Sequence, residues 1–349
     1  MGNNELVVAN YRLYLNGSEF SPELLAAIES ITVEDELNLP AMFAIKLNIV
    51  DFDKGDWRWI GLEAVKPGDV VKIFMGVDTP AEMMTGEITS LEVAFGAYCY
   101  MEIRGYDRLH RLRFGTKRRS FKDMKDSDIA AKIANEAGLL PQIEDTGTVI
   151  PYLFQNNQSN YEFLLERGRR LGYEMLVNDK TFYFRKSQEG KAPELTLEYN
   201  LDFDSFTAQM RALTEGSEVE VRGWGVKDKK EITATAKSGS ETSAMAGLET
   251  GYKLSQTAFG DFPVAVIDEA VIDESDAGKI AKAKYNTLLK EFITGEGTCL
   301  GNPSIRAGKT VELKGIGTRF SGPYYLAATV HSINEEGYKT TFKVKRTGI

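Results

Sequence analysis

The chain has 349 residues, of which 42% are hydrophobic and 27% charged, and its 42 basic and 51 acidic side chains give a formal charge of −9. This composition is typical of a globular protein, and the length suits two or three domains of about 150 residues each. The charge argues against general binding to nucleic acids or anionic membranes, and no apolar run reaches the roughly 18 residues of a membrane-spanning helix.

The first part of the chain is predicted to consist of β-strands. Short alternating segments begin with "LVVANYRLYLNG", at residues 6–17, and turn signals recur about every ten residues. Asn16-Gly17 is a favoured hairpin dipeptide, and Pro67-Gly68-Asp69 precedes a strand rich in Val and Ile. We predict a first antiparallel β-barrel domain over residues 1–112.

The period then changes from two to 3.6 residues. Residues 127–138 place apolar side chains at helical spacing. Ser159 and Glu162 form a capping box at the start of a second helix, which ends at Gly172. A hairpin turning at Asn178-Asp179 follows, so residues 113–190 are predicted to be an inserted α+β domain.

Strand patterns resume in residues 191–349, which we predict to form a second β-barrel domain. A loop-plus-helix insertion at about 233–293 interrupts it, with a small polar excursion at 233–251 and a helix at 275–292. The fold class is therefore mainly β, with two similar antiparallel barrel-like domains and helix-bearing inserted units.

The C-terminal stretch reads as two strands joined at 334–337. One face of the second strand is expected to be buried and the other wet. The two faces carry Tyr338, Thr340, Phe342 and Val344 on one side and Lys339, Thr341, Lys343 and Lys345 on the other. The preceding strand is apolar on both sides, which indicates cover on both faces. His331 is interpreted as structural, because no partner for general-base chemistry can be identified.

No motif predicts an enzyme. Cys99 and Cys299 are 200 residues apart, and with His110 and His331 they give no zinc-binding spacing. The G-x-G segments lack a third glycine and a following helix, and G-x-S-x-G does not occur. We therefore predict no catalytic residues, no cofactor and no metal.

The segment 104–121 is the strongest local concentration of positive charge, with seven Arg or Lys side chains. A nucleic-acid site would need a basic face on the whole domain, which this acidic chain does not offer. Two interpretations stay open at equal weight: arginines that meet acidic groups across a subunit interface, and a solvated connector between domains.

Several segments together resemble the phage late control protein D and VgrG-like family. They occur in the same order over nearly the whole chain and read "LNLPAMFAIKLNI", "YDRLHRLRFGTKRRSF", "NNQSNYEFLLERGRRLGYEMLV", "GNPSIRAGKTVEL" and "SGPYYLAATVHSINEEGYKTTFKVKR". The resemblance implies a baseplate hub, the central ring of contractile tails, tailocins and related injection systems. Three chains with two similar barrels each would present six roughly equivalent surfaces, which adapts a sixfold tail tube to a threefold spike.

The resemblance also implies the partners. We expect a homotrimer that contacts tail tube protein, a separate spike protein and other baseplate components. It would have no specific nucleic-acid binding and no membrane anchor, and DNA or cargo would pass through its lumen. Because the sequence ends just after "TTFKVKRTGI", we expect the spike to be a separate polypeptide. Without a signal peptide, the chain is expected to assemble in the bacterial cytoplasm and to become part of a virion, tailocin or injection particle.

Candidate contact residues follow from the same resemblance. The residues predicted to contact other subunits or partners are Arg108, Arg111, Arg113, Phe342, Val344 and Lys345. An acidic particle is further expected to present a lumen that repels DNA. Two alternatives stay open: a tip-associated cell-wall hydrolase of the same particle, and a soluble ligand-binding β protein.

Overall fold

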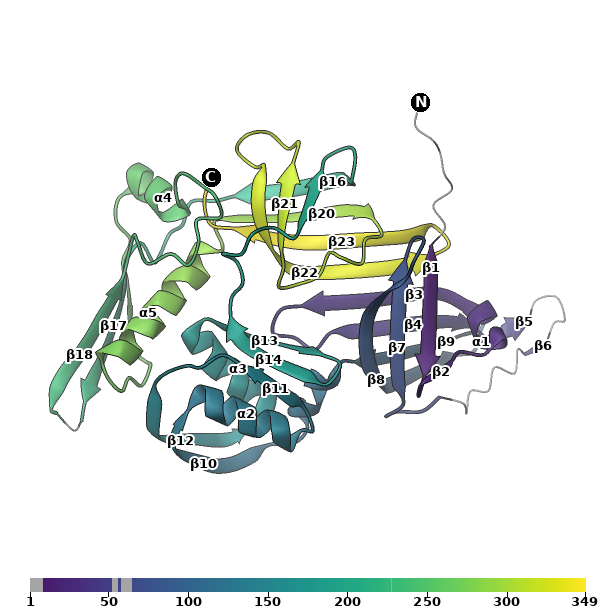
Figure 1. The fold of residues 1–349 in the computed structure, drawn as a ribbon, viewed down its shortest axis with the longest axis horizontal. Coiled ribbons are helices and arrows are strands. Elements are labelled where there is room, and N and C mark those ends of the chain that lie inside the picture. The colour runs from purple at the N-terminus through teal and green to yellow at the C-terminus, as the bar shows by residue number, and fades with distance from the viewer. Residues whose placement is uncertain (1–8, 52–55, 58–64, 227) are drawn as a thin grey trace.

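The computed structural model describes residues 9–51, 56–57, 65–226 and 228–349. Residues 6–8 of the first predicted strand lie outside this range. Figure 1 shows a first β half at one end of the molecule and two long C-terminal strands (yellow) that run back toward it. The helix-bearing units lie beside and below these strands.

The first half is an antiparallel sheet with one short helix. Its elements are β1 (Asn10–Leu15), β2 (Ser18–Glu19), α1 (Pro22–Ala27), β3 (Ile28–Glu36), β4 (Met42–Asn48), β5 (Val50–Asp51), β6 (Asp56–Trp57), β7 (Val70–Gly76), β8 (Ala81–Ala94) and β9 (Tyr100–Tyr106). The main strands lie in the order β3-β4-β9-β8-β7-β1-β2, and β5 pairs with β6 apart from them. Asn16 and Gly17 both have positive φ, as the predicted hairpin turn requires.

The second half has a comparable sheet. Its strands are β15 (Leu195–Glu198), β16 (Phe203–Met210), β20 (Ile293–Leu300), β21 (Thr310–Lys314), β22 (Gly322–Asn334) and β23 (Gly337–Arg346). They lie in the order β16-β20-β23-β22-β21-β15, with only the last pair parallel. The predicted C-terminal hairpin is confirmed, because Asn334 pairs with Gly337 at its tip.

The two halves share one sheet. β22 pairs with β21 over its first residues and then with β3 of the first half, from Ala328 opposite Glu36 to Ile333 opposite Ile31. A sheet of 13 strands results, so the two halves are continuous with each other through their strands. The physical reason is that the long β22 extends beyond the short β21 and offers a further edge to β3.

The halves repeat the same strand order along the chain. β3, β4, β7, β8 and β9 correspond in order and pairing to β16, β20, β21, β22 and β23. A bulge at Glu29 of β3 matches one at Asp204 of β16, and a bulge at Thr89 of β8 matches one at Ala327 of β22. Bulges alter strand direction and twist, so two shared bulges make the two sheets similar in shape as well as in order.

The α+β unit separates the halves in the sequence. It contains η2 (Arg108–Arg113), β10 (Lys117–Lys125), α2 (Asp126–Glu136), β11 (Leu140–Ile143), β12 (Val149–Gln158), α3 (Asn160–Leu171), β13 (Tyr173–Asn178) and β14 (Thr181–Lys186). The predicted capping box begins α3: Glu162 N–H donates to Ser159 Oγ (3.1 Å), and Ser159 N–H donates to the Glu162 carboxylate (2.8 Å). The expected hairpin joins β13 and β14, with its two-residue turn at Asp179-Lys180, one residue later than predicted.

The insertion in the second half consists of β17 (Val219–Gly225), β18 (Lys230–Ala236), α4 (Gly251–Phe259), β19 (Val264–Val266) and α5 (Glu274–Leu289). α5 packs on β17 and β18 and also contacts α3 of the α+β unit. Arg170 of α3 donates to both carboxylate oxygens of Asp276, at 2.9 and 2.6 Å, and both side chains are buried. This ion pair fixes the insertion to the α+β unit.

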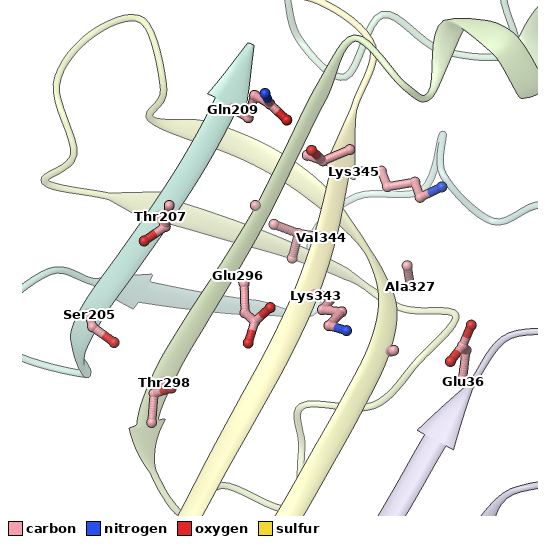
Figure 2. Close-up of a pocket in the computed structure, with 13 residues that line it drawn as sticks. Glu36, Ser205, Thr207, Gln209, Glu296, Thr298, Ala327, Lys343, Val344 and Lys345 are labelled. Carbon is pink, nitrogen blue, oxygen red and sulfur yellow. The ribbon is translucent and has the colours of Figure 1, made fainter. Parts of the chain in front are cut away.

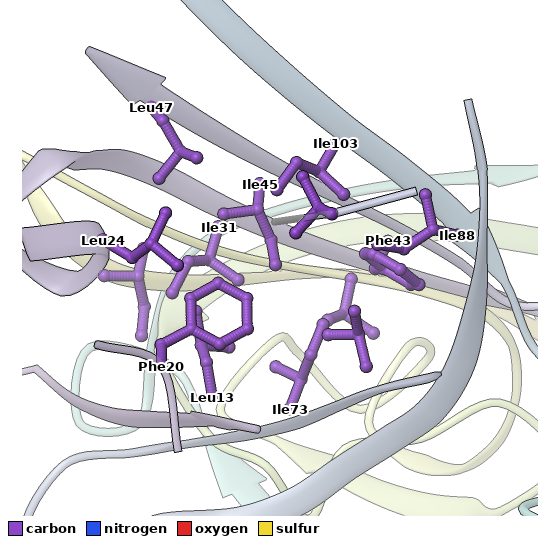
Figure 3. Packing of buried hydrophobic residues seen from close by; sticks show 14 of the residues in the cluster. Leu13, Phe20, Leu24, Ile31, Phe43, Ile45, Leu47, Ile73, Ile88 and Ile103 are labelled. Atoms are coloured by element: carbon purple, nitrogen blue, oxygen red, sulfur yellow. The ribbon is translucent and has the colours of Figure 1, made fainter. Parts of the chain in front are cut away.

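Three hydrophobic clusters form the core. Figure 3 shows the first, in which Phe43, Ile45 and Leu47 of β4 point to the same side. This cluster also takes in Ile333 and Tyr338 from the C-terminal hairpin, so the two halves share core as well as sheet. A second cluster fills the second half with its insertion, and a third lies inside the α+β unit. The division at residues 112 and 190 remains a prediction.

Candidate functional site

A polar sheet face runs across both halves. It covers eight neighbouring strands in the order β16, β20, β23, β22, β3, β4, β9 and β8. The side chains on it that are at least partly exposed include Ser205, Thr207, Gln209, Thr294, Glu296, Thr298, Lys339, Thr341, Lys343, Lys345, Ser332, Thr32, Glu34, Glu36, Lys46, Glu102, Arg104, Ser90 and Glu92. Alternate residues of the same strands are buried, so the sheet has one core side and one polar side.

Part of this face is hollowed. A depression of about 700 Å³ lies over β16, β20, β23 and β22 and reaches Glu36 of β3. In Figure 2, the labelled side chains of Thr207, Glu296 and Lys343 come from successive strands and line the same hollow. Glu296 and Lys343 are directly opposite each other in the ladder, which is a favourable cross-strand arrangement. The hollow is open and has polar side chains from several strands along it, unlike a pocket that encloses a small ligand.

The charges on the polar face are balanced. Its carboxylates are Glu34, Glu36, Glu92, Glu102 and Glu296, and its cations are Lys46, Arg104, Lys339, Lys343 and Lys345. Some of them pair directly, such as Arg104 with Glu102 at 2.8 Å. This face therefore carries no excess of negative charge.

The arginine cluster, which consists of Arg108, Arg111 and Arg113, joins the first β half to the α+β unit. Arg108 is buried and pairs with Glu87 of β8 (3.4 Å) and with Asp179 at the β13–β14 turn. Arg111 also donates to Glu87, at 2.9 Å from its Nε. Burial alone would raise the pKa of Glu87, but the hydrogen bond from Arg111 and the surrounding positive charges hold it below its usual value. The guanidinium of Arg113 lies 4.4 Å from the ring centre of Tyr161 in α3.

Carboxylates of the same chain engage Arg108 and Arg111, so these two side chains do not behave as part of a solvated connector. A contact between Arg108, Arg111 or Arg113 and another subunit remains a prediction. Arg111 and Arg113 are exposed and therefore more accessible than the buried Arg108. Sequence reasoning missed the partners because Glu87 and Asp179 carry no local signal for this pairing.

Asp107 positions the start of the cluster. Its carboxylate accepts hydrogen bonds from Leu109 N–H (2.8 Å) and Ala41 N–H (3.1 Å), which caps η2 and ties it to β4. Burial raises the pKa of Asp107 to about 7, against the lowering effect of the two backbone donors.

The candidate contact residues in β23 lie on different sides of the strand. Phe342 and Val344 are 0% and 1% exposed and belong to the core of the second half. Their prediction as contact residues is corrected, because the same alternation that makes this strand half-buried places their side chains inside. Lys345 is on the polar face, is 35% exposed and pairs with Glu291, so its role in a contact remains a prediction.

His331 is an interior residue. It is fully buried: its Nε2 lies 2.9 Å from the Ile305 carbonyl oxygen, and its Nδ1 lies 3.0 Å from the hydroxyls of Tyr338 and Thr340. Burial, helped by the charge of Arg306, lowers the pKa of His331 to about 3. These contacts agree with the structural interpretation of His331.

The two cysteines are free and buried. Burial raises the pKa of Cys299 to about 12, which keeps it as a thiol. Within the described parts of the chain, no three His, Cys, Asp or Glu side chains are grouped so as to hold a metal ion. No helix among the described residues is both long and apolar enough to span a membrane.

Residues 5–335 match a protein family described as the Alg8 N-terminal domain. Among solved structures, the chain is similar to a 43 kDa tail protein of prophage MuSo2 from Shewanella oneidensis, with a TM-score of 0.73, 13% identity and coverage of 97% of this chain and 98% of that one. It is also similar to a tail protein from Neisseria meningitidis MC58, with a TM-score of 0.70, 14% identity and coverage of 97% and 96%.

A third similar structure is the E. coli c3393 protein, described as a component of the type VI secretion system with structural similarity to the T4 bacteriophage tail proteins gp27 and gp5. Its TM-score is 0.57 at 11% identity, with coverage of 92% of this chain and 74% of that one. No curated protein sequence matches the chain. At these identities the likeness establishes a shared fold, which agrees with the resemblance seen in the sequence.

Proposed function

The chain belongs to the Alg8 N-terminal domain family, whose match covers residues 5–335, and we propose that it is the structural hub of a contractile injection particle such as a phage tail or tailocin. The observation that carries this proposal is a fold shared over its whole length with phage tail proteins, built from two halves with the same strand order. Fold alone does not define function, so the proposal also needs the surfaces described above.

The proposed assembly is a homotrimer. Each copy contributes two similar β halves, centred on residues 1–112 and 191–349, and three copies present six similar surfaces around one axis. Such a ring matches a sixfold tail tube on one side and a threefold spike on the other. Ring closure needs two different patches on each copy, one at each end of its sheet.

The polar sheet face is the proposed wall of the lumen. Its balanced charges offer no strong attraction to a polyanion, so DNA or other cargo would pass without being held. The helix-bearing units are proposed to contact other baseplate components. In this role the chain performs no catalysis.

A cell-wall hydrolase is the second class that the sequence left open. A histidine general base must reach its substrate, and both histidines are buried among partners of the same chain. These contacts disfavour a hydrolase that depends on histidine.

Deletion of the gene in a strain that makes the particle tests the proposal. We expect loss of assembled tubes and sheaths in electron micrographs, with recovery when the gene is supplied on a plasmid. Normal-length particles without this chain would contradict the hub role. Clearing of cell-wall substrate by the purified chain would favour the hydrolase instead.

A further inference from the structure

The junction between the two halves is itself a subunit-like contact. β22 first pairs with β21, passes the bulge at Ala327 and then pairs with β3. Leu37 N–H donates to the Ala327 carbonyl (3.1 Å) at the point where β22 changes partners. Two repeated modules are thus joined edge to edge within one chain.

β8 occupies in the first half the place that β22 occupies in the second. The turns before β7 and β21 make the same two backbone hydrogen bonds to these strands. Gly68 N–H donates to Ile88 O and Gly308 N–H to Leu326 O, both at 2.8 Å. The return bonds from Ile88 and Leu326 are both 2.9 Å. Since these bonds immediately precede the bulges at Thr89 and Ala327, residue 89 is equivalent to residue 327.

Among the described residues, the two outermost edges of the eight-strand sheet, at residues 90–94 of β8 and at β16, lack a second strand partner. β8 pairs with β7 only up to Glu87, and residues 90–94 pair with β9 alone. At the other end of the eight strands, β16 pairs along its length only with β20. Within the described ranges no strand covers either edge, and exposed edges of this kind are templates for pairing with another chain.

We propose that residues 90–94 of β8 in one copy pair antiparallel with β16 of the next copy, in the way that β22 pairs with β3 inside each chain. This inference rests on the proposed trimeric hub and specifies its subunit junction. The occupant of each edge is a second copy of this chain, because the chain's own internal junction is the template for both edges.

The internal junction also fixes the register. The matched bulges make Gln209 equivalent to Glu34 and Glu92 equivalent to Val330, and Glu34 is directly opposite Val330. Glu92 should therefore lie opposite Gln209 of the next copy. The whole set of expected pairs is Ser90 with Arg211, Leu91 with Met210, Glu92 with Gln209, Val93 with Ala208 and Ala94 with Thr207.

The side chains agree with this register. Leu91 and Val93 alternate with exposed polar residues and lie on the core side of β8, and Met210 and Ala208 lie on the core side of β16. Met210 is 37% exposed in the single chain, so the junction would cover it. A shift by one residue would place these apolar side chains against polar ones, which disfavours other registers.

The junction makes the polar face continuous around the ring. Three copies of the eight strands would close a cylinder of 24 strands, with three junctions inside the chains and three between them. Each contact between copies joins the β8 edge of one to the β16 edge of the next, which is the heterologous arrangement that forms closed rings.

Disulfide trapping tests the register in the full-length chain. Directly opposed cross-strand residues have Cβ atoms about 4.5–5.5 Å apart, close to disulfide geometry. The test variant combines Glu92→Cys with Gln209→Cys. The matched control combines Glu92→Cys with Ser205→Cys, four residues or about 13 Å further along the same face of the strand. All three positions are exposed, and the native cysteines are buried.

Under mild oxidation we expect covalent dimers and trimers, without larger species, at several-fold higher yield in the test variant than in the control. Native mass spectrometry of the same samples distinguishes a failure of the proposed junction from a failure of the proposed trimeric hub. A trimeric mass with equal or absent cross-linking would overturn the junction and leave the hub intact. A chain that stays monomeric and does not cross-link, with and without the spike protein, would contradict both.

A second pair of variants tests the junction without cysteines. Met210→Glu places a charge on the core side of the proposed junction and should weaken trimerisation at least about tenfold. Thr207→Lys adds a charge on the polar face of the same strand and should leave the trimer mass unchanged. Equal effects of the two variants would contradict the assigned sides of β16.

Discussion

His331 gives the sharpest test of the interior of the second half. Because the Ile305 carbonyl can only accept a hydrogen bond, the neutral imidazole carries its proton on Nε2, and Nδ1 accepts from Tyr338 or Thr340. The pKa of His331 is about 3 in the folded chain against 6.5 for a free side chain. Between these values the unfolded chain binds a proton that the folded chain does not.

The free energy of unfolding should therefore fall as the pH falls through this window. The slope from one such proton is about 1.4 kcal/mol per pH unit, which totals about 4 to 5 kcal/mol from pH 6.5 to pH 3. Above pH 6.5 both states are neutral at this side chain and the contribution is constant. His331→Gln removes the titrating group and, at neutral pH, costs about 1–2 kcal/mol for the imperfectly replaced hydrogen bonds.

The two stability curves should cross. At pH 7 the variant should be the less stable protein, and near pH 4 it should be the more stable one, since the original chain has by then lost about 3 kcal/mol that the variant keeps. Urea unfolding followed by circular dichroism between pH 4 and pH 7 measures both curves. Tyr338→Phe is the control, because it removes one hydrogen-bond partner and retains the imidazole. A constant gap between the original chain and His331→Gln would refute the reasoning.

Two further substitutions test how the parts of the chain are held together. Arg170→Ala leaves the buried carboxylate of Asp276 without its partner and should lower the free energy of unfolding by about 3–5 kcal/mol. The control Arg211→Ala removes an exposed ion pair and should lower it by less than about 1 kcal/mol. Equal losses in urea titrations would contradict the importance of the buried ion pair. Gly105→Ala should lower the free energy of unfolding, measured by thermal unfolding, by about 1–3 kcal/mol. The reason is that its Cβ would lie 2.2 Å from the Glu87 carbonyl oxygen and 2.5 Å from the Phe43 ring. Gly96→Ala, which has open space around it, should leave the stability nearly unchanged.

Local patterns in the sequence predicted those elements that depend on neighbouring residues. The alternation after Gly337 gave the faces of β23, and the capping box at Ser159 gave the start of α3, because both signals lie within a few residues of the structure they specify. The predicted helix at 275–292 is observed as α5, which ends at Leu289. The mainly β fold is confirmed at this level.

Features that depend on distant residues were not predicted. The pairing of β22 with β3 joins positions about 300 residues apart in the chain, and strand pairing of this kind leaves no mark in either segment alone. The apolar character of both sides of β22 indicated only that it would be covered. The same limit applies to Arg108, whose partner Asp179 is 71 residues away.

Short elements in polar segments were also missed. α4 begins at Gly251, beside a stretch interpreted as an exposed excursion, and it is held by a cap at Thr250 and by the buried ring of Tyr252. α1 was missed between two strands, although Ser21 caps it and Pro22 begins it. Such helices have few residues with which to show a period, so tertiary packing determines them.

The proposed homotrimer is best tested by the mass of the purified chain in solution, measured alone and with its spike protein. The account predicts a species of three times the 38.8 kDa of one chain, either at once or when the spike is added. A mass that stays at that of one chain at every concentration, with and without the spike, would contradict it.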